Sequence, residues 1–583
     1  MASGRQLDAS RRARSKRVIA QLALFLFLLG SKGVSASAQN PPSDAARLEA
    51  ARSAFDASHW EETAKLSQGP PEQSPDLDFL AGLAFARLER WNDARGAFEA
   101  GHRKSPDDPR FLVELAGVAY KQKELGTAKR DLHAALRLDP QDAYAREFLG
   151  TLYFLDGNLE AALKYWNAVD KPRLRAVDFV PAPKLRQEVL AHGVTFSAPQ
   201  VLTRDALDDT RARLSNLGIY PHQRVELTAS KSGDYDATLD LDERNGWGDS
   251  KLEGVVSLLS GLPYETVYPE FYNLHREAVN FKSLARWDSQ KRRFSGELSA
   301  PLFHEPALRI KTFFDARNEN WNLSRTFFAA GAPLTDLNLR RVAGGVELRS
   351  VVNGRWSWST GLEFAHRSFR NLEGHTSAVE RPFFTDSNSF TYWLGGERSL
   401  IRDPEHRFTL NSPVEARVGR GFNDALGPFA TARGALRAHW FPRAKGDDYE
   451  MQAQVRAGGT VGRVPLDELF QLGLERDNDL WLRGQPGTLN GRKGAAPLGR
   501  RYFLANWEMD KNIYRGAFFN LKLGPFLDSG AAADSSGLFG SQRWLWDTGA
   551  QCKIRILGSV TVVLSYGRDL RGGRNVYYGT VLR

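Results

Sequence analysis

Beyond residue 40 the chain contains no run of 18 apolar residues, so no segment there predicts a membrane-spanning helix. Residues 250–583 instead consist of short runs in which apolar and polar residues alternate, separated by Gly, Asn and Asp. This period of two predicts β-strands with one apolar and one polar face. Examples are RFSGELSA (293–300), LRIKTFFDAR (308–317), GRWSWSTGLEFAHRSF (354–369), FFNLKLGPFLD (518–528) and SVTVVLSYGRDL (559–570).

The N-terminus has the three parts of a secretory signal peptide. A basic stretch that includes Arg11, Arg12 and Arg14 precedes an apolar core, VIAQLALFLFLLG (18–30), and Ala-Ser-Ala follows at 36–38. The alternative is a membrane anchor, but about 13 apolar residues are short for one. Residues 1–38 carry seven Lys or Arg and one Asp, which is +6 of the formal net charge of +10. The remaining chain is only weakly basic, so we predict no nucleic-acid partner.

An exported chain without a spanning helix can cross lipid only as a closed β-barrel, because every backbone polar group must be paired. Residues 249–583 therefore predict a transmembrane antiparallel β-barrel. About 16 strands of roughly 10 residues fit this length, and 12 or 14 also fit. Trp356 and Trp358 share one face of their predicted strand, as in the aromatic girdle of such a barrel. A soluble sandwich or propeller is the alternative.

Residues 39–171 repeat with a period of 34. Ala94, Ala128 and Ala162 keep this interval, and so do Pro106 and Pro140. Small residues recur where two helices approach closely. The pattern resembles the tetratricopeptide (TPR) repeat, which implies an α-helical solenoid with these five residues in its packing. Its concave surface would dock a periplasmic protein or peptide, or the repeats would serve only as a spacer.

Residues 172–248 predict a small α/β module with the order β-α-α-β-β. Thr203 is a candidate helix N-cap, and Gly218 stands where that helix should end. The phrase LSNLGIY (214–220) and the closing DLDERN (240–245) resemble a POTRA (polypeptide-transport-associated) domain. The residues that carry this resemblance are Leu217, Gly218, Tyr220, Glu243 and Arg244. Such domains accept a client strand at a sheet edge.

The stretch DLWLRGQPG (479–487) places Arg483 and Gly484 before a sharp turn. FLDSG (526–530) follows with Asp528 and Gly530, and Glu508 lies between the two motifs. An arginine inside a barrel needs a carboxylate partner. We therefore predict that Arg483 pairs with Asp528, with Glu508 as the second candidate.

The order of signal peptide, POTRA-like module and C-terminal barrel resembles the BamA/TamA-type bacterial surface antigen superfamily. In that superfamily an R-G motif lies on a loop folded into the barrel, and an F-x-D-x-G motif lies on a later strand. The resemblance covers about 172–583. It implies an outer-membrane protein, with its N-terminal domains in the periplasm, that inserts client polypeptides into the membrane or translocates them across it. The alternatives are a two-partner-secretion pore with one client, a TPR-barrel polysaccharide exporter, and a structural or lipid-handling barrel whose repeats recruit a partner.

We expect no catalytic activity, metal or cofactor. The sequence has no H-E-x-x-H, G-x-S-x-G or P-loop motif. Cys552 is the single cysteine, which excludes an internal disulfide framework. The expected partners are unfolded outer-membrane or secreted polypeptides, the outer-membrane lipid and a periplasmic protein on the TPR surface.

Overall fold

The computed structural model describes residues 43–582 except 71, 232, 249–250, 324–335, 374–380, 423–426, 444, 517, 535–540, 542 and 557–559. The predicted signal peptide, residues 1–38, lies outside the described residues. The described residues divide into two compact units, of which the first lies within 43–152, 168–170 and 229–235, and the second within 153–167, 171–228 and 236–582. None of the described helices is long and apolar enough to cross a membrane.

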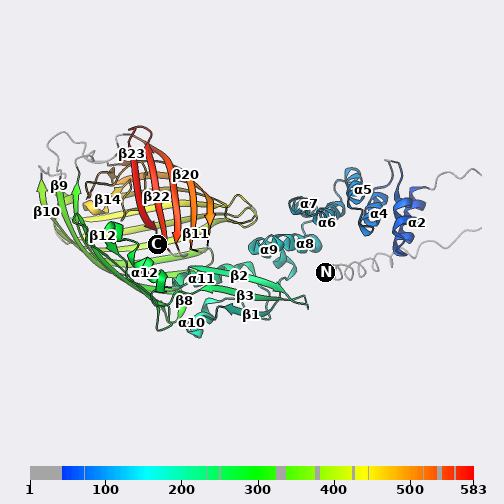
Figure 1. The fold of residues 1–583 in the computed structure, drawn as a ribbon, viewed down its shortest axis with the longest axis horizontal. Coiled ribbons are helices and arrows are strands. Elements are labelled where there is room, and N and C mark those ends of the chain that lie inside the picture. The colour runs from blue at the N-terminus through cyan, green and yellow to red at the C-terminus, as the bar shows by residue number, and fades with distance from the viewer. Residues whose placement is uncertain are drawn as a thin grey trace, which may run out of the picture. The chain divides into compact units, whose positions relative to one another are not determined.

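The first unit is a series of antiparallel helix pairs (Figure 1). Its helices are α2 (Asp44–Asp56), α3 (Trp60–Ser67), α4 (Pro75–Arg87), α5 (Trp91–Lys104), α6 (Pro109–Lys121), α7 (Leu125–Leu138) and most of α8 (Ala143–Leu155). Ala94 and Ala128 are fully buried, as the repeat predicts. Ser74 and Asp108 cap α4 and α6 by accepting hydrogen bonds from backbone N–H groups of the first turn.

The two repeat prolines do not pack in this helical unit, which corrects the role that the sequence suggested for them. Pro106 and Pro140 are exposed and lie just after the C-terminal ends of α5 and α7. Proline cannot continue a helix because it lacks the N–H donor. The 34-residue spacing of the prolines therefore marks where helices end, whereas the spacing of the alanines marks where helices pack.

The second unit begins with α9 (Leu159–Trp166), in which Ala162 is fully buried, and η1 (Asn167–Val169) borders it. The α/β module follows in the predicted order, as β1 (Leu174–Val180), α10 (Gln187–Gly193), α11 (Arg204–Leu217), β2 (His222–Ala229) and β3 (Tyr235–Asp242). The three strands form one sheet in the order β1-β3-β2. Thr203 caps α11 by accepting from Ala206 N, and Gly218 ends it with φ 71°, a conformation that glycine adopts without steric cost.

Most of the second unit is a closed β-barrel (Figure 1). A helix, α12 (Lys251–Leu259), and η2 (Leu262–Tyr264) precede it. The strands are β4 (Thr266–Val267), β5 (Glu270–Leu274), β6 (Val279–Arg286), β7 (Lys291–Leu302), β8 (Glu305–Asn322), β9 (Asp336–Asn353), β10 (Trp356–Glu373), β11 (Ser387–Asp403), β12 (Phe408–Gly421), β13 (Pro428–Trp440), β14 (Tyr449–Gly462), β19 (Arg501–Arg515), β20 (Phe519–Ala533), β21 (Leu545–Ile556), β22 (Val560–Asp569) and β23 (Asn575–Leu582). η3 (Arg381–Phe384) lies between β10 and β11.

The predicted antiparallel β-barrel is confirmed, and its number of strands lies within the range of 12 to 16 expected from the length of the segment. The described residues contain fourteen barrel strands of eight to eighteen residues, while β4 and β5 lie end to end along β6. β8, β9 and β10 each have eighteen residues, and only Gly354 and Arg355 separate β9 from β10. Because the turns at one end are this short, chain length alone does not give the number of strands.

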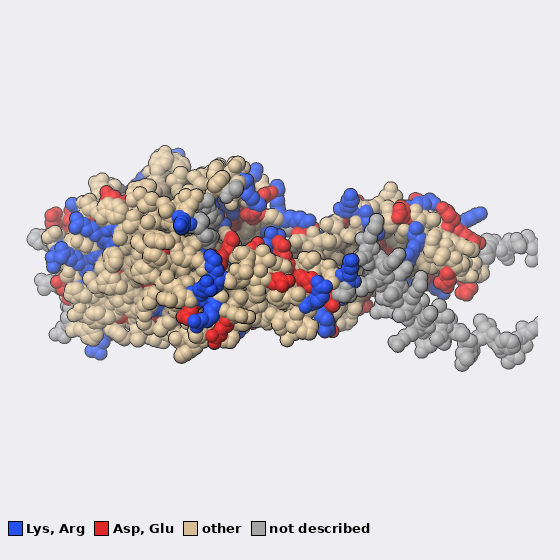
Figure 2. Space-filling view, turned by 60° about the horizontal axis from the view of Figure 1, so that its bottom comes forward, with Lys and Arg blue, Asp and Glu red and all other residues tan. Residues whose placement is uncertain are grey.

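Side chains alternate across the barrel wall. Leu362 and Phe364 of β10 are exposed, whereas Glu363 between them is buried. On β20 the exposed Leu527 precedes Asp528, which has no exposed surface. The outer surface in Figure 2 is accordingly dominated by uncharged residues. The wall is therefore apolar outside and charged inside, which is the pattern of a barrel that faces lipid.

Candidate functional site

The segment between β14 and β19, residues 463–500, folds into the barrel and is called the luminal loop below. It contains η4 (Leu466–Glu468), β15 (Phe470–Gln471), β16 (Thr488–Leu489), β17 (Arg492–Lys493) and β18 (Leu498–Gly499). The loop is bonded to Arg286 of β6 on one wall and to Asp528 of β20 on another. Since both side chains face the interior, the loop crosses the lumen.

Arg483 lies near the middle of this loop and is 4% exposed. Its Nε and Nη2 atoms donate to the two carboxylate oxygens of Asp528 at 2.9 and 2.7 Å, and its backbone N–H donates to Asp528 Oδ2 at 2.9 Å. Nη1 donates to Glu508 Oε2 at 2.8 Å and to Gln551 Oε1 at 2.9 Å. The guanidinium carbon lies 3.8 Å from the ring centroid of Phe526. The structure thus brings both carboxylates named from the sequence to Arg483.

These contacts compensate the burial of the guanidinium. A buried arginine is costly unless it is paired and its N–H groups are satisfied. Asp528 provides the two-point carboxylate contact that matches the planar guanidinium fork, and Phe526 covers one face of the plane. Asn506 also donates to Asp528 Oδ1 at 2.7 Å. The pair therefore fixes both the position and the orientation of the loop.

Glycines at three positions allow the backbone to come this close. A Cβ atom on Gly567 of β22 would lie 2.0 Å from the carbonyl oxygen of Arg483. A Cβ atom on Gly484 would lie 2.6 Å from the carboxylate of Asp547, which accepts a hydrogen bond from Gly484 N at 2.8 Å. One on Gly530 would lie 2.5 Å from Phe503 O. Gly484 and Gly530 of the two motifs thus have a steric role in the docking of the loop and in strand packing.

Several partners in this site were missed by the sequence reading. Asn506, Gln551 and Asp547 each bond to the Arg483–Gly484 segment or to Asp528, and Lys553 donates to Glu508 Oε1 at 2.5 Å. They come from β19 and β21, which flank β20 in the barrel. Only the alternation within these strands could have indicated that their polar side chains face inward.

Two further groups of ion pairs hold the loop to the opposite wall. Asp477 accepts from Arg286 at 2.8 Å and from Arg293 of β7 at 2.6 Å. Asp467 accepts from Arg367 of β10 at 2.7 Å and lies 3.2 Å from Arg341 of β9. Arg367 has no exposed surface. The loop is therefore held by buried charge pairs on both sides of the lumen.

The residues that resemble a POTRA domain lie where the α/β module meets the barrel. Tyr220 is buried and its hydroxyl donates to Glu243 Oε2 at 3.3 Å, and burial raises the pKa of this phenol. Glu243 also accepts from Asn273 Nδ2 of β5 at 2.9 Å, and Arg244 lies over the ring of Tyr272. These residues therefore join the module to the first barrel strands.

Leu217 and Gly218 lie at the same junction, at the end of α11. Asn280 of β6 donates to Leu217 O at 2.8 Å, and Arg309 of β8 donates to Asn216 O at 2.7 Å. The C-terminal carbonyl groups of a helix lack partners within the helix, so these barrel side chains satisfy them. Within the described residues, no group of three or more His, Cys, Asp or Glu is arranged to hold a metal ion.

Comparison with known proteins gives one matching family and several similar solved structures. The tetratricopeptide repeat family matches residues 79–128 and 125–172. No curated protein sequence matches the chain significantly. Among solved structures, BamA from Haemophilus ducreyi lacking POTRA domains 1–3 is similar, with a TM-score of 0.42 and 12% identity over 70% of this chain and 85% of that chain.

CdiB from Escherichia coli is similar with a TM-score of 0.44 and 13% identity, over 71% of this chain and 75% of that chain. CdiB from Acinetobacter baumannii gives a TM-score of 0.41 and 14% identity, over 70% and 73%.

Proposed function

We propose that the protein is an outer-membrane barrel that inserts polypeptides into that membrane or moves them across it, with its N-terminal helical and α/β domains in the periplasm. The observation that carries this proposal is the luminal loop, which is held inside a closed, apolar-faced barrel by the buried Arg483–Asp528 pair. In this proposal the loop is seated at rest and is displaced when a client passes, since only hydrogen bonds and ion pairs hold it to the inner wall. Such an element suits a gate for a large substrate.

The first and last strands of the barrel support the same proposal. β23 lies beside β4 in the closed strand order, yet β4 has two residues and β23 has eight. A short ladder leaves backbone groups of β23 available for another strand. The boundary between β23 and β4 is called the seam below. The luminal loop contacts both sides of the seam. The guanidinium carbon of Arg476 lies 3.9 Å from the ring centroid of Tyr264, which precedes β4, and the ring centroid of Trp481 lies 6.0 Å from that of Tyr578 in β23. Seating of the loop and closure of the seam are then coupled.

Client docking begins on the α/β module in this proposal. β1 and β2 are the outer strands of its sheet, and an extended client segment pairs with such an edge through main-chain hydrogen bonds. The client then passes to the barrel, whose first strands are bonded to the module through Glu243 and Asn273. No step in this route requires a cofactor or covalent chemistry.

Depletion of the protein in its native host, followed by quantitative comparison of outer-membrane and secreted proteins, tests this proposal. Loss of many barrel proteins supports a general insertase, and loss of one secreted or surface protein supports a dedicated pore. Unchanged proteins together with loss of a surface polysaccharide would contradict the proposal in favour of an exporter.

A further inference from the structure

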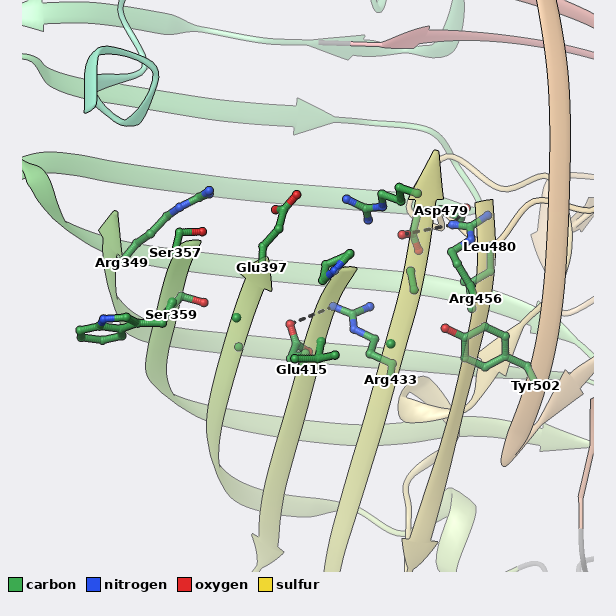
Figure 3. Close-up of a pocket in the computed structure, with 18 residues that line it drawn as sticks. Arg349, Ser357, Ser359, Glu397, Glu415, Arg433, Arg456, Asp479, Leu480 and Tyr502 are labelled. Atoms are coloured by element: carbon green, nitrogen blue, oxygen red, sulfur yellow. Dashed lines mark hydrogen bonds and ion pairs between the residues drawn. The ribbon is translucent and has the colours of Figure 1, made fainter. Parts of the chain in front are cut away.

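The luminal loop leaves part of the barrel interior open along β9 to β14. A cavity of about 220 Å³ lies there against the inner wall (Figure 3). Two neighbouring cavities, of about 430 and 580 Å³, share lining residues with it, including Glu415 and Arg433 in one case and Arg349 and Glu397 in the other. The three cavities therefore adjoin one another, and together they are called the luminal chamber below.

Cations outnumber carboxylates in this chamber. Its lining includes eleven Lys or Arg side chains and six Asp or Glu side chains. Most of the carboxylates already have a cation close by, such as Glu415 with Arg433 at 3.1 Å and Glu347 with Lys311 at 2.6 Å. Several of the cations are paired with carboxylates outside the lining, as Arg293 is with Asp477 and Arg402 is with Glu160, so the cations without such a partner are the ones available to a ligand.

Two arginines of the chamber have all their donors available. Among the described residues, Arg349 of β9 and Arg437 of β13 have neither a hydrogen bond nor an ion pair to another side chain, and both are exposed to the lumen. In Figure 3 the side chain of Arg349 extends from its strand into the cavity. A guanidinium group with a free planar edge is the protein group best suited to bind a carboxylate at two points.

A third arginine of the chamber is buried and incompletely satisfied. Arg456 of β14 is 8% exposed, and it donates through Nη1 to Asp479 O and through Nη2 to Asn506 Oδ1, each at 2.7 Å. Its Nε has no partner among the described residues. An unmet donor makes the burial of this guanidinium costly. This donor belongs to a side chain that lines the 220 Å³ cavity.

We propose that the luminal chamber binds an extended polypeptide segment through the carboxylates of its Asp and Glu side chains, with Arg349, Arg437 and Arg456 as the binding residues. The inference rests on the proposed function, because that function supplies a polypeptide in the lumen. The hydroxyls of Ser357 and Ser359, which also line the cavity, offer further hydrogen bonds to a peptide backbone. A free dicarboxylate offers the same carboxylate groups as an acidic peptide, so the test compares the binding of both.

The full-length protein in lipid nanodiscs provides the test, with fluorescence anisotropy of a labelled unstructured peptide that carries alternate glutamates. The matched probe has glutamine at the same positions. Each lost charge-assisted contact weakens binding about tenfold, so the glutamate peptide should bind at least about tenfold more tightly than its glutamine counterpart. Raised salt should reduce this difference.

The variant Arg349→Gln/Arg437→Gln should weaken binding of the glutamate peptide by at least about tenfold. Since neither side chain has a partner to lose, the barrel should fold as before, and heat-dependent migration in gels checks this. The control is Arg420→Gln, which removes an exposed arginine of β12 on the outward face that also carries Val418. It should leave the affinity unchanged.

Equal affinities for the two peptides, or equal weakening by Arg420→Gln, would overturn the chamber site. Binding of glutarate without binding of the peptide would overturn the polypeptide assignment, and so would tighter binding of polygalacturonate than of the peptide. These outcomes are independent of the depletion experiment. If depletion leaves the amounts of all outer-membrane and secreted proteins unchanged, the proposed function is overturned whether or not the peptide binds.

Discussion

Arg483 of the luminal loop and Asp528 of β20 are joined by three hydrogen bonds, one from the backbone N–H and two from the guanidinium. The pair is buried, and Glu508 and Gln551 satisfy the remaining guanidinium nitrogen. The loop therefore has one preferred seated position, which depends on charge pairing rather than on apolar packing alone.

Arg483→Ala and Asp528→Ala should each lower the free energy of unfolding by about 3–5 kcal/mol, because each leaves a buried charge without its partner. The barrel should still close, since its backbone ladder does not depend on this pair. The double variant should cost less than the sum of the two single variants. Chemical unfolding in detergent micelles measures all three.

Arg492→Ala is the matched control, because it removes an arginine of the same loop whose ion pair with Asp336 is 41% and 24% exposed. An exposed pair contributes about 0–1 kcal/mol, so this variant should have little effect. Additive costs for Arg483→Ala and Asp528→Ala, or a cost no larger than that of Arg492→Ala, would contradict the account of the pair.

Gly567→Ala should displace the luminal loop without removing any charge. Its new methyl group would lie 2.0 Å from Arg483 O, which is closer than atoms can approach. Limited proteolysis should then cut residues 476–487 faster in this variant than in the wild type. Gly296→Ala is the control, since its methyl group would meet its nearest neighbour at an ordinary 3.7 Å. Equal cleavage rates in both variants would show that the loop seats without this close approach.

The two motifs of the site could be read from the sequence, but most of their surroundings could not. Arg483 and Asp528 lie in short phrases with distinctive glycines. Asn506, Gln551 and Asp547 lie in strands where they look like any other polar residue of an alternating pattern. Their convergence depends on the register between β19, β20 and β21, in which Asn506 pairs with Asp528 and Asp528 with Asp547. Strand register depends on turn geometry and on which face of each strand is buried, so the alternation of one strand does not show which residue of the next strand it meets.

The ion pairs that hold the luminal loop to β6 and β7 could not be predicted from local patterns either. Asp477 meets Arg286 and Arg293, which are 191 and 184 residues away in the sequence. The order of elements in the α/β module was predictable because Thr203 and Gly218 mark the ends of a helix by local chemistry. Local signals therefore predicted elements and caps, whereas the long-range ion pairs needed the barrel.

Loss of either seam contact should loosen β23. Arg476→Ala removes the stacking on Tyr264, and Trp481→Ala removes the contact with Tyr578. The cation–π contact of Arg476 and the aromatic pair of Trp481 are each worth about 1 kcal/mol, so amide exchange in β23 should rise about fivefold in each variant. Hydrogen exchange with mass spectrometry measures this, with β12 as the internal reference strand.

Val461→Ala, which shortens a side chain that is 62% exposed on β14, should leave exchange in β23 unchanged. If Arg476→Ala and Trp481→Ala also leave it unchanged, the loop does not stabilise the seam.

Asp208 of α11 should make the α/β module sensitive to pH. Burial raises the pKa of this carboxyl to about 6, although Arg402 lies 2.9 Å away. A folded-state pKa above the unfolded value means that protonation stabilises the fold. This stabilisation is complete below about pH 4 and is lost as the pH rises through about 6. Asp208→Asn should therefore be as stable as the wild type at pH 4 and more stable than it at pH 7.

Thermal unfolding followed by helical circular dichroism compares the two proteins at each pH. Asp205→Asn, on the same helix with a side chain that is 83% exposed, should match the wild type at both pH values. A stability difference between Asp208→Asn and the wild type that does not change with pH would show that Asp208 is charged throughout this range.

The most direct test of the central claim is complementation of the depleted host with Arg483→Ala, scored by the recovery of client proteins in the outer membrane and the medium. Client recovery is divided by the amount of folded barrel, so that lower stability does not count as lost function. We expect recovery well below that of the wild type for Arg483→Ala, and full recovery for the loop control Arg492→Ala. Full recovery by Arg483→Ala at equal amounts of folded barrel would contradict the claim that the seated luminal loop controls polypeptide passage.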